Sequence, residues 1–177
     1  MNYTPEQIAE IVLKVLKEVN EPDVLSLSFD ETIKLAKNPN TLPETLKVLA
    51  TDENSCVRCC VARNPNTLPE TLNVLATDEN YCVRCWVAEN PNTPAETLKV
   101  LATDKDSCVR CYVAENPNTP VETLKVLATD KDSCVRSGVA RNPNYKTQTL
   151  ELTQVQYDAL KVLLKSSQDE TLKTLSL

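Results

Sequence analysis

Three pairs of cysteines carry the clearest chemical signal in the sequence, because each pair has the C-x-x-C spacing of metal-binding and redox-active thiols. The pairs recur at regular steps along the chain: Cys56/Cys59, Cys82/Cys85 and Cys108/Cys111. Cys134 holds the first place of a fourth pair, in which Ser137 replaces the second cysteine. A tetrahedral zinc site needs four sulfurs within about 4 Å of one another, whereas neighbouring helices pack about 8–10 Å apart. Each pair offers only two ligands, so we expect no metal and no cofactor.

Two other roles for these cysteines stay open. The first cysteine of each pair and Cys134 lie at expected helix N-termini, where a thiolate is favoured, so they could be redox-active or otherwise reactive. Alternatively, the cysteines are small, half-buried packing residues that repeat duplication has spread along the chain. We prefer packing, and we keep a thiol-based metal-binding or redox-sensing protein as the alternative function.

Composition excludes several classes of function. Histidine is absent and glycine occurs once, so the sequence offers neither a nucleophile–base pair with histidine nor a glycine-rich phosphate loop, and we expect no enzyme activity. The net charge of -6 lacks the basic footprint of a nucleic-acid-binding protein. No apolar run approaches the roughly 20 residues of a membrane span, and the N-terminus does not resemble a signal peptide. We therefore expect a cytoplasmic protein with reduced thiols, without nucleic-acid or membrane partners.

An internal repeat dominates the organisation of the chain. The motif Asn-Pro-Asn begins at positions 38, 64, 90, 116 and 142, in steps of 26 residues. The spacing predicts three regions. Residues 1–37 form capping helices and a degenerate half-repeat, residues 38–141 form four repeats, and residues 142–177 form an irregular insert and C-terminal capping helices.

Each repeat reads as two short helices. Thr41 and Glu44 have the spacing of a capping box at the start of the first helix, and the same pair recurs in every repeat. Leu46, Leu49 and Ala50 form the apolar stripe of that helix. The second helix starts after Ser55, and its buried stripe holds Val57 and Val61. The next Asn-Pro ends it, because a residue before proline avoids helical backbone.

Asparagine takes the place of glycine in the predicted turns. Its side chain tolerates left-handed backbone and bonds locally. Stacked at one position in successive repeats, the Asn side chains could also bond along the stack, and both readings stay open. One repeat cannot bury its own apolar face, whereas stacked repeats can. An amphipathic segment at 4–19 is expected to cover the first end of the stack.

The stretch "CVRCCVARNPNTLPETLNVLATD", which joins the first repeat to the second, resembles the variant leucine-rich repeats. The resemblance covers about residues 30–141. It implies an all-α fold, a right-handed α/3₁₀ helical solenoid of 26-residue repeats with helical caps and no sheet. One branch of that family carries an iron–sulfur cluster on cysteines before the repeats. Here the first cysteine is Cys56, so that cluster has no ligands. The resemblance implies no settled biochemical function.

One column of the repeat varies while its neighbours are copied. It holds Cys60, Trp86, Tyr112 and Gly138. A change from glycine to tryptophan would overpack a core, so we predict that this column points out of the core. Tyr81 replaces serine in another column and adds a second aromatic to the same repeat. Exposed aromatics indicate a contact site, although neutral variation at an exposed position would give the same pattern.

A second column is invariant and holds arginine. Its side chains could bind a carboxylate-rich partner or phosphates, or they could pair with Asp52 or Asp78 and with carbonyls at a helix end. From these columns we predict a non-enzymatic module that binds a protein or peptide on one face of the solenoid, whose ends are also candidates for self-association. The predicted partner-binding residues are Trp86, Tyr112, Cys60, Tyr81, Arg58, Arg84, Arg110 and Arg136.

Overall fold

The computed structural model describes residues 27–146 and 156–159, and every regular element in this part of the chain is a helix. The chain divides into two compact units, residues 1–97 and 98–177. The predicted caps at 4–19 and in the C-terminal region after residue 146, apart from 156–159, lie outside the described residues.

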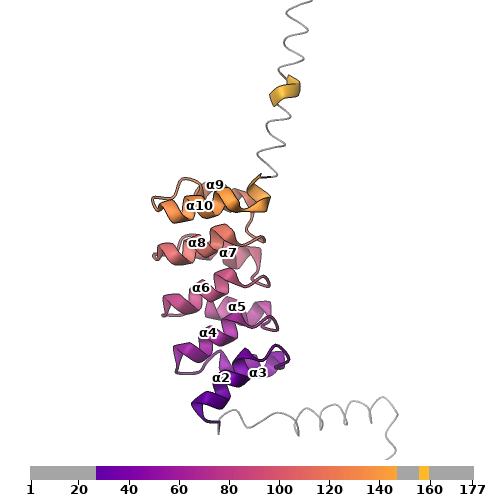
Figure 1. Ribbon diagram of the computed structural model, residues 1–177, viewed down its shortest axis with the longest axis vertical. Coiled ribbons are helices and arrows are strands. Elements are labelled where there is room, and N and C mark those ends of the chain that lie inside the picture. Colours follow the sequence, from indigo (N-terminus) through magenta and orange to yellow (C-terminus); the bar gives the residue numbers. More distant parts are fainter. Residues whose placement is uncertain (1–26, 147–155, 160–177) are drawn as a thin grey trace, which may run out of the picture. The chain divides into compact units, whose positions relative to one another are not determined.

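Long and short helices alternate along the described chain (Figure 1). In unit 1 the long helices contact one another in sequence order, α2 with α4 and α4 with α6. In unit 2 the long helices α8 and α10 pack together. The long helices are α2 (Phe29–Lys37), α4 (Ser55–Arg63), α6 (Tyr81–Glu89), α8 (Ser107–Glu115) and α10 (Ser133–Arg141). The short helices are α3 (Pro43–Leu49), α5 (Pro69–Leu75), α7 (Ala95–Leu101) and α9 (Val121–Leu127).

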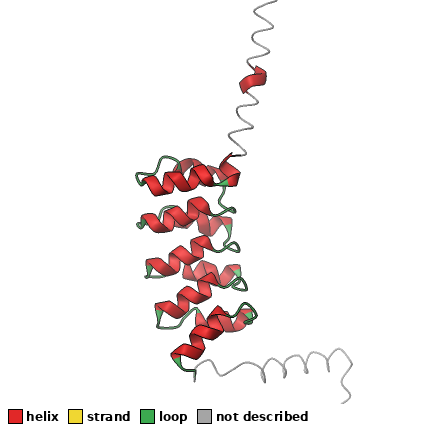
Figure 2. Ribbon diagram, viewed as in Figure 1, coloured by secondary structure: helices red, strands yellow, loops and turns green. Residues whose placement is uncertain are grey.

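Both helices of each repeat are α-helices, where the family resemblance implied that one of them is often 3₁₀. Loops join them and no strand interrupts the described residues (Figure 2). The all-helical prediction is therefore confirmed. The right-handed course of the stack stays a prediction.

The predicted apolar stripes form the core. Leu46 and Leu49 of α3 are 0% and 1% exposed, and Val57 and Val61 of α4 are both 0% exposed. The same positions are buried in the later repeats. Burial of these aliphatic side chains stabilises each repeat through the hydrophobic effect, by about 1.5–3 kcal/mol for each fully buried side chain. Packing of the stripe therefore holds each short helix against the long helices beside it.

The predicted capping boxes are wrong. The helix α3 starts at Pro43 with Leu42 as its N-cap, so Thr41 lies before the helix. The hydroxyl of Thr41 donates instead to the Leu35 carbonyl at the end of the preceding helix, at 2.6 Å. Thr67, Thr93 and Thr119 make the corresponding bond in their own repeats. The Leu35 carbonyl also accepts from the Asn38 N–H at the helix cap, at 3.1 Å, so the threonine supplies a second donor to this carbonyl in the last turn of α2.

The asparagine turns use ordinary backbone. None of the described residues has a positive φ, so the left-handed conformation expected for these turns does not occur. Asn64 serves both of the roles that the sequence left open. Its Oδ1 accepts from the Asn66 N–H within the turn, and its Nδ2 donates to the Ala36 and Asn38 carbonyls of the preceding repeat at 2.8 and 2.9 Å.

Candidate functional site

The arginine column is occupied by structural contacts. Arg58 forms a two-point ion pair with Asp78, at 2.6 Å from Nε and 3.0 Å from Nη2, and its Nη1 donates to the Asp52 and Glu53 carbonyls. In unit 2, Arg110 pairs with Asp130 in the same way. These bonds match the structural alternative, which named Asp78 as a partner. The Arg58 side chain is 11% exposed, and its bonds leave little of the guanidinium for a binding partner.

The ion pairs lower the pKa values of the aspartates. The hydrogen bond from Arg110 lowers the pKa of Asp130, although burial opposes this shift. Burial acts to raise the pKa of Asp78, but hydrogen bonds from Arg58 and from the Asn80 N–H outweigh it, so that the pKa is lowered. The carboxylates are thus held ionised, which is what a permanent structural pair requires.

The other two arginines extend this pattern. Arg84 and Arg110 are each only 6% exposed, and the Arg84 Nη1 donates to the Asp78 and Glu79 carbonyls. Arg136 lies near the end of the described repeats and is exposed, with Nη1 donating to the Asp130 and Lys131 carbonyls. A partner-binding role in this column is therefore supported by exposure at Arg136 alone.

The variable column lies at the edge of the core. Cys60, Trp86 and Tyr112 are half-buried, and Gly138 is buried. A Cβ placed on Gly138 would meet the Ala114 Cβ at 3.0 Å, which is a tight contact, so α10 packs closely on α8 at this position. The prediction that the whole column points out of the core is therefore wrong at Gly138. Tyr81 is 48% exposed, as its column predicted.

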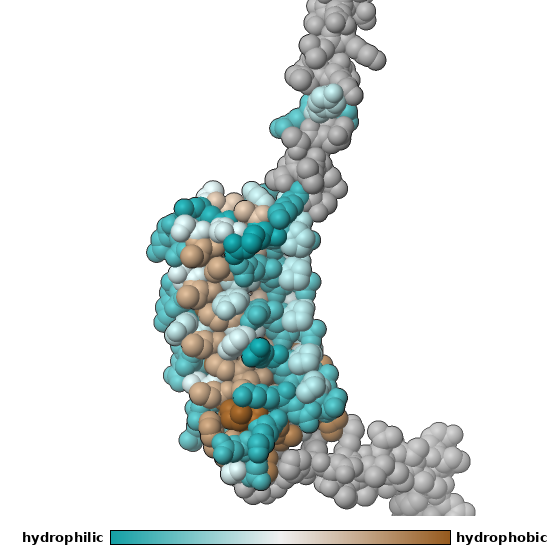
Figure 3. Space-filling model, viewed as in Figure 1, coloured by the Kyte–Doolittle hydropathy of each residue, from teal (hydrophilic) through white to brown (hydrophobic). Residues whose placement is uncertain are grey.

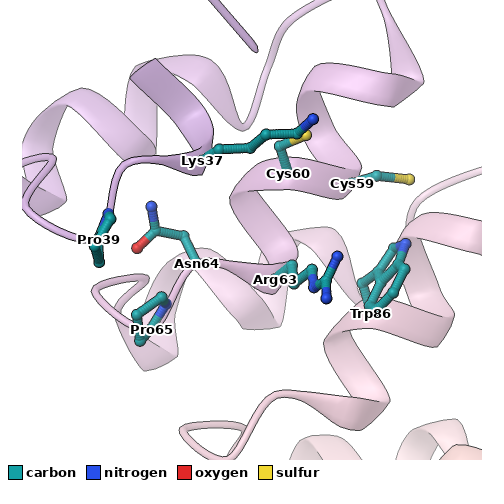
Figure 4. A pocket seen from close by; sticks show the side chains of 8 residues that line it. All are labelled: Lys37, Pro39, Cys59, Cys60, Arg63, Asn64, Pro65 and Trp86. Carbon is teal, nitrogen blue, oxygen red and sulfur yellow. The ribbon is translucent and has the colours of Figure 1, made fainter. Parts of the chain in front are cut away.

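Trp86 borders a groove on unit 1. The groove has a volume of about 470 Å³ and is built from the last turns of α2 and α4, the turns that follow them, and α6 (Figure 4). The Arg63 guanidinium carbon lies 4.7 Å from the centre of the Trp86 ring, a cation–π distance. The residues that line the groove are Lys37, Pro39, Cys59, Cys60, Arg63, Asn64, Pro65 and Trp86.

Of the predicted partner-binding residues, Trp86 and Cys60 line this groove, whereas Lys37 and Arg63 were not predicted. Both basic residues occupy the last position of a long helix, directly before the Asn that recurs in every repeat. That position reads Lys37, Arg63, Glu89, Glu115 and Arg141 along the chain. It changes in charge while its neighbours are copied, and this variation was the signal that could have revealed it.

A second hollow of about 600 Å³ lies between α3 and α5. Among its lining residues are Glu44, Glu70 and Lys47, so its charges are mixed, and Val74 is 61% exposed. Figure 3 shows the face that carries the long helices, where apolar side chains lie among polar ones. The groove at Trp86 differs from the second hollow because the charged residues among its described lining, Lys37 and Arg63, are both cations.

All eight cysteines are free thiols. Burial raises the pKa of Cys59 to about 11, and burial also raises the pKa values of Cys60 and Cys111. At Cys108, on the first turn of α8, burial and the neighbouring Asp106 raise the pKa as well. A raised pKa reduces the thiolate fraction on which thiol reactivity depends, so the predicted activation at helix N-termini does not occur at Cys108.

The described residues contain no group of three or more Cys, Asp or Glu side chains placed to hold a metal ion. Within the same part of the chain, no helix has the length and apolar character needed to cross a bilayer.

The described chain is thus an all-helical repeat protein, in which each repeat contributes one short and one long α-helix. The leucine rich repeat variant family matches it at residues 82–106 and 109–132, as two tandem repeats. This match confirms the resemblance seen in the sequence. No curated protein and no solved structure matches the chain.

Proposed function

We propose that the protein is a non-enzymatic interaction module that holds a segment of another protein or peptide in the groove beside Trp86. The half-buried indole at the border of a concave surface is the observation that carries this proposal. Tryptophan is strongly enriched among residues that dominate binding energy, and such anchors lie in desolvated pockets. A non-enzymatic role is supported by the absence of histidine from the sequence. A cytoplasmic location is supported by eight unpaired thiols.

The groove is suited to a peptide better than to a small molecule. It is an open hollow across two successive repeats, lined by Pro39, Pro65 and Cys60 as well as by the indole. Stacked repeats present equivalent positions at regular steps, so an extended segment can contact more than one of them. On unit 2, Tyr112 and Arg136 stay proposed contact residues in their own right.

The test selects binders from a random peptide display library on the purified full chain. Affinities of the enriched peptides are then measured on the wild type and on Trp86→Ala. We expect Trp86→Ala to weaken binding by about 30-fold or more, which is about 2 kcal/mol. Phe29→Ala is the matched control, because Phe29 is a 52% exposed aromatic of unit 1 that does not line the groove.

A change in stability would make Trp86→Ala ambiguous, so the unfolding midpoint of each variant is measured first. If Trp86→Ala unfolds the chain, quenching of the indole fluorescence by acrylamide in the wild type decides the matter. Trp86 is the single tryptophan, so the signal has one source. An indole shielded from the quencher, or peptides that bind both variants equally, would overturn the proposal.

A further inference from the structure

We propose that the partner segment is acidic, and that Lys37 and Arg63 bind a carboxylate side chain of that segment beside the ring of Trp86. This inference rests on the proposed function and names the chemistry of the partner. It follows from the charges at the ends of the long helices, from the geometry of the groove and from the apolar surface around it.

The residue that ends each long helix sets the local charge. In unit 2 this position holds Glu115 and Arg141 on adjacent long helices, and these two side chains form an ion pair with each other. In unit 1 the same position on adjacent long helices holds Lys37 and Arg63. Two cations cannot neutralise each other. The helix ends that hold an ion pair in unit 2 therefore carry two positive charges in unit 1.

No acid neutralises this charge from within the groove. Among the described lining residues there is no Asp or Glu. Glu89 borders a separate hollow of about 170 Å³ together with Arg63 and Trp86. Among the described residues, however, it lies in no ion pair with Arg63, because no such pair falls within 4.0 Å. The groove is therefore a local positive site on a chain whose net charge is -6.

The two cations line the same groove from successive long helices. Arg63 lies against the face of Trp86, so stacking orients the planar guanidinium and its N–H groups remain available at the edge. Lys37 extends from the end of α2 toward Cys60 on α4 (Figure 4). An oriented guanidinium binds a carboxylate through two parallel hydrogen bonds, and the flexible lysine adds a second charge.

The position favours a carboxylate over a phosphate. Lys37 and Arg63 are the last residues of α2 and α4, and the C-terminus of a helix carries partial negative charge. Phosphate sites in proteins typically use the opposite end of a helix, where backbone N–H groups point outward. A singly charged carboxylate meets less repulsion here than a phosphate dianion.

The remainder of the groove defines the neighbouring residue of the partner. Pro39, Pro65, Cys60 and the indole give it apolar walls. An aliphatic side chain or proline next to the acidic residue would bury apolar area there, which favours binding. The expected partner is thus a short, extended segment with an acidic residue beside an apolar one.

The experiment compares random 12-residue peptides selected on the wild type with those selected on Arg63→Glu. We expect the wild type to enrich Asp and Glu next to an aliphatic residue or proline, and Arg63→Glu to lose that preference. Enriched peptides are then synthesised with the acidic residue changed to its amide, Glu→Gln or Asp→Asn. This change should weaken binding by about tenfold or more, followed through Trp86 fluorescence.

Lys47→Glu is the matched control, because it changes the net charge of the same unit equally and Lys47 does not line the groove. It should leave the affinity within about twofold. Peptides that bind through Trp86 but are neutral, or that bind Arg63→Glu equally, would overturn the acidic assignment and leave the proposed function intact. Failure to enrich any peptide would overturn both. Tenfold tighter binding of a phosphoserine version would replace the carboxylate with a phosphate.

Discussion

The invariant asparagine before each proline links neighbouring repeats through their backbones. Asn142 is 1% exposed; its Nδ2 donates to the Ala114 and Asn116 carbonyls at 2.8 and 2.9 Å, and its Oδ1 accepts from the Asn144 N–H. Three bonds from one amide satisfy groups of two repeats at once. A buried polar group that loses its partner costs about 1–3 kcal/mol, which accounts for asparagine at this position in every repeat.

Asn142→Ala should therefore destabilise the chain by about 1–3 kcal/mol, because two carbonyls lose their donor. Asn142→Asp should cost more, since a carboxylate would face those carbonyls and repel them. Urea unfolding at neutral pH measures both. Asn40→Ala is the control, because Asn40 is exposed. Equal stability of Asn142→Asp and the wild type would show that the amide does not carry these bonds.

The arginine–aspartate pair gives a second prediction at the residue scale. The pKa of Asp130 is lowered by its hydrogen bond to Arg110. A carboxylate whose pKa is lower in the folded state adds stability above its unfolded pKa of about 3.9, and that stability is lost as the pH falls through the folded pKa. Asp130→Asn should cost about 2 kcal/mol at pH 7, and the difference should shrink toward pH 2.

Unfolding free energies of the wild type and Asp130→Asn across this pH range provide the measurement. Glu53→Gln is the control, because Glu53 is exposed and forms no ion pair within the described residues. A difference that stays constant from pH 7 to pH 2 would show that charge plays no part in the Asp130 contact.

At the scale of the helix, neighbouring valine and leucine have opposite environments. Leu75 of α5 is 1% exposed, whereas Val74 beside it is 61% exposed. Leu75→Ala should destabilise by about 2–5 kcal/mol, as for other buried leucines. Val74→Ala should change the stability by no more than about 0.5 kcal/mol. Thermal or urea unfolding compares the two, and a large effect of Val74→Ala would contradict the orientation of α5.

The periodic elements could be predicted from the sequence because they repeat. The spacing of Leu46, Leu49, Val57 and Val61 indicated two helices per repeat and their buried faces, and all four are buried. The exact start of α3 could not be predicted, because Thr41 fits a capping box as well as it fits a bond to the preceding helix. Only tertiary contact with the Leu35 carbonyl separates these two roles.

The candidate site could be predicted in part. Variation in one column identified Trp86, but volume alone placed Gly138 outside the core, whereas Gly138 is buried against Ala114 of the neighbouring long helix. Lys37 and Arg63 were missed because their importance depends on which residues face each other across repeats. The sequence shows that the charge changes at this position. The contacts between neighbouring repeats decide whether two such side chains form an ion pair or leave a net positive charge.

At the scale of the whole molecule, the net charge of -6 opposes the acidic partner proposed for the groove. The repulsion acts at long range and is screened beyond about 10 Å at 0.1 M salt. The attraction of Lys37 and Arg63 acts at contact distance, where screening is weaker. Recognition is then governed by the local pair of cations, while the charge of the whole chain slows association at low salt.

The eight thiols give the prediction for the whole chain. Cys56, Cys108 and Cys134 are exposed, whereas Cys85 is buried. With a pKa of about 11, Cys59 is about one part in a thousand thiolate at pH 8, so it should react slowly. A disulfide-exchange dye should therefore label a small exposed set first and Cys59 and Cys85 last. Raising the pH toward 11 should speed the reaction of Cys59.

In denaturant without reductant, all eight cysteines should react, because each is a free thiol in the structure. A chelator should leave the melting temperature unchanged, since the described residues hold no cluster of three ligands. Elemental analysis of protein purified without added zinc or iron provides the control. Fewer than eight reactive thiols in denaturant would reveal a disulfide, and one retained metal per chain with a melting temperature lowered by chelator would establish the thiol-based alternative.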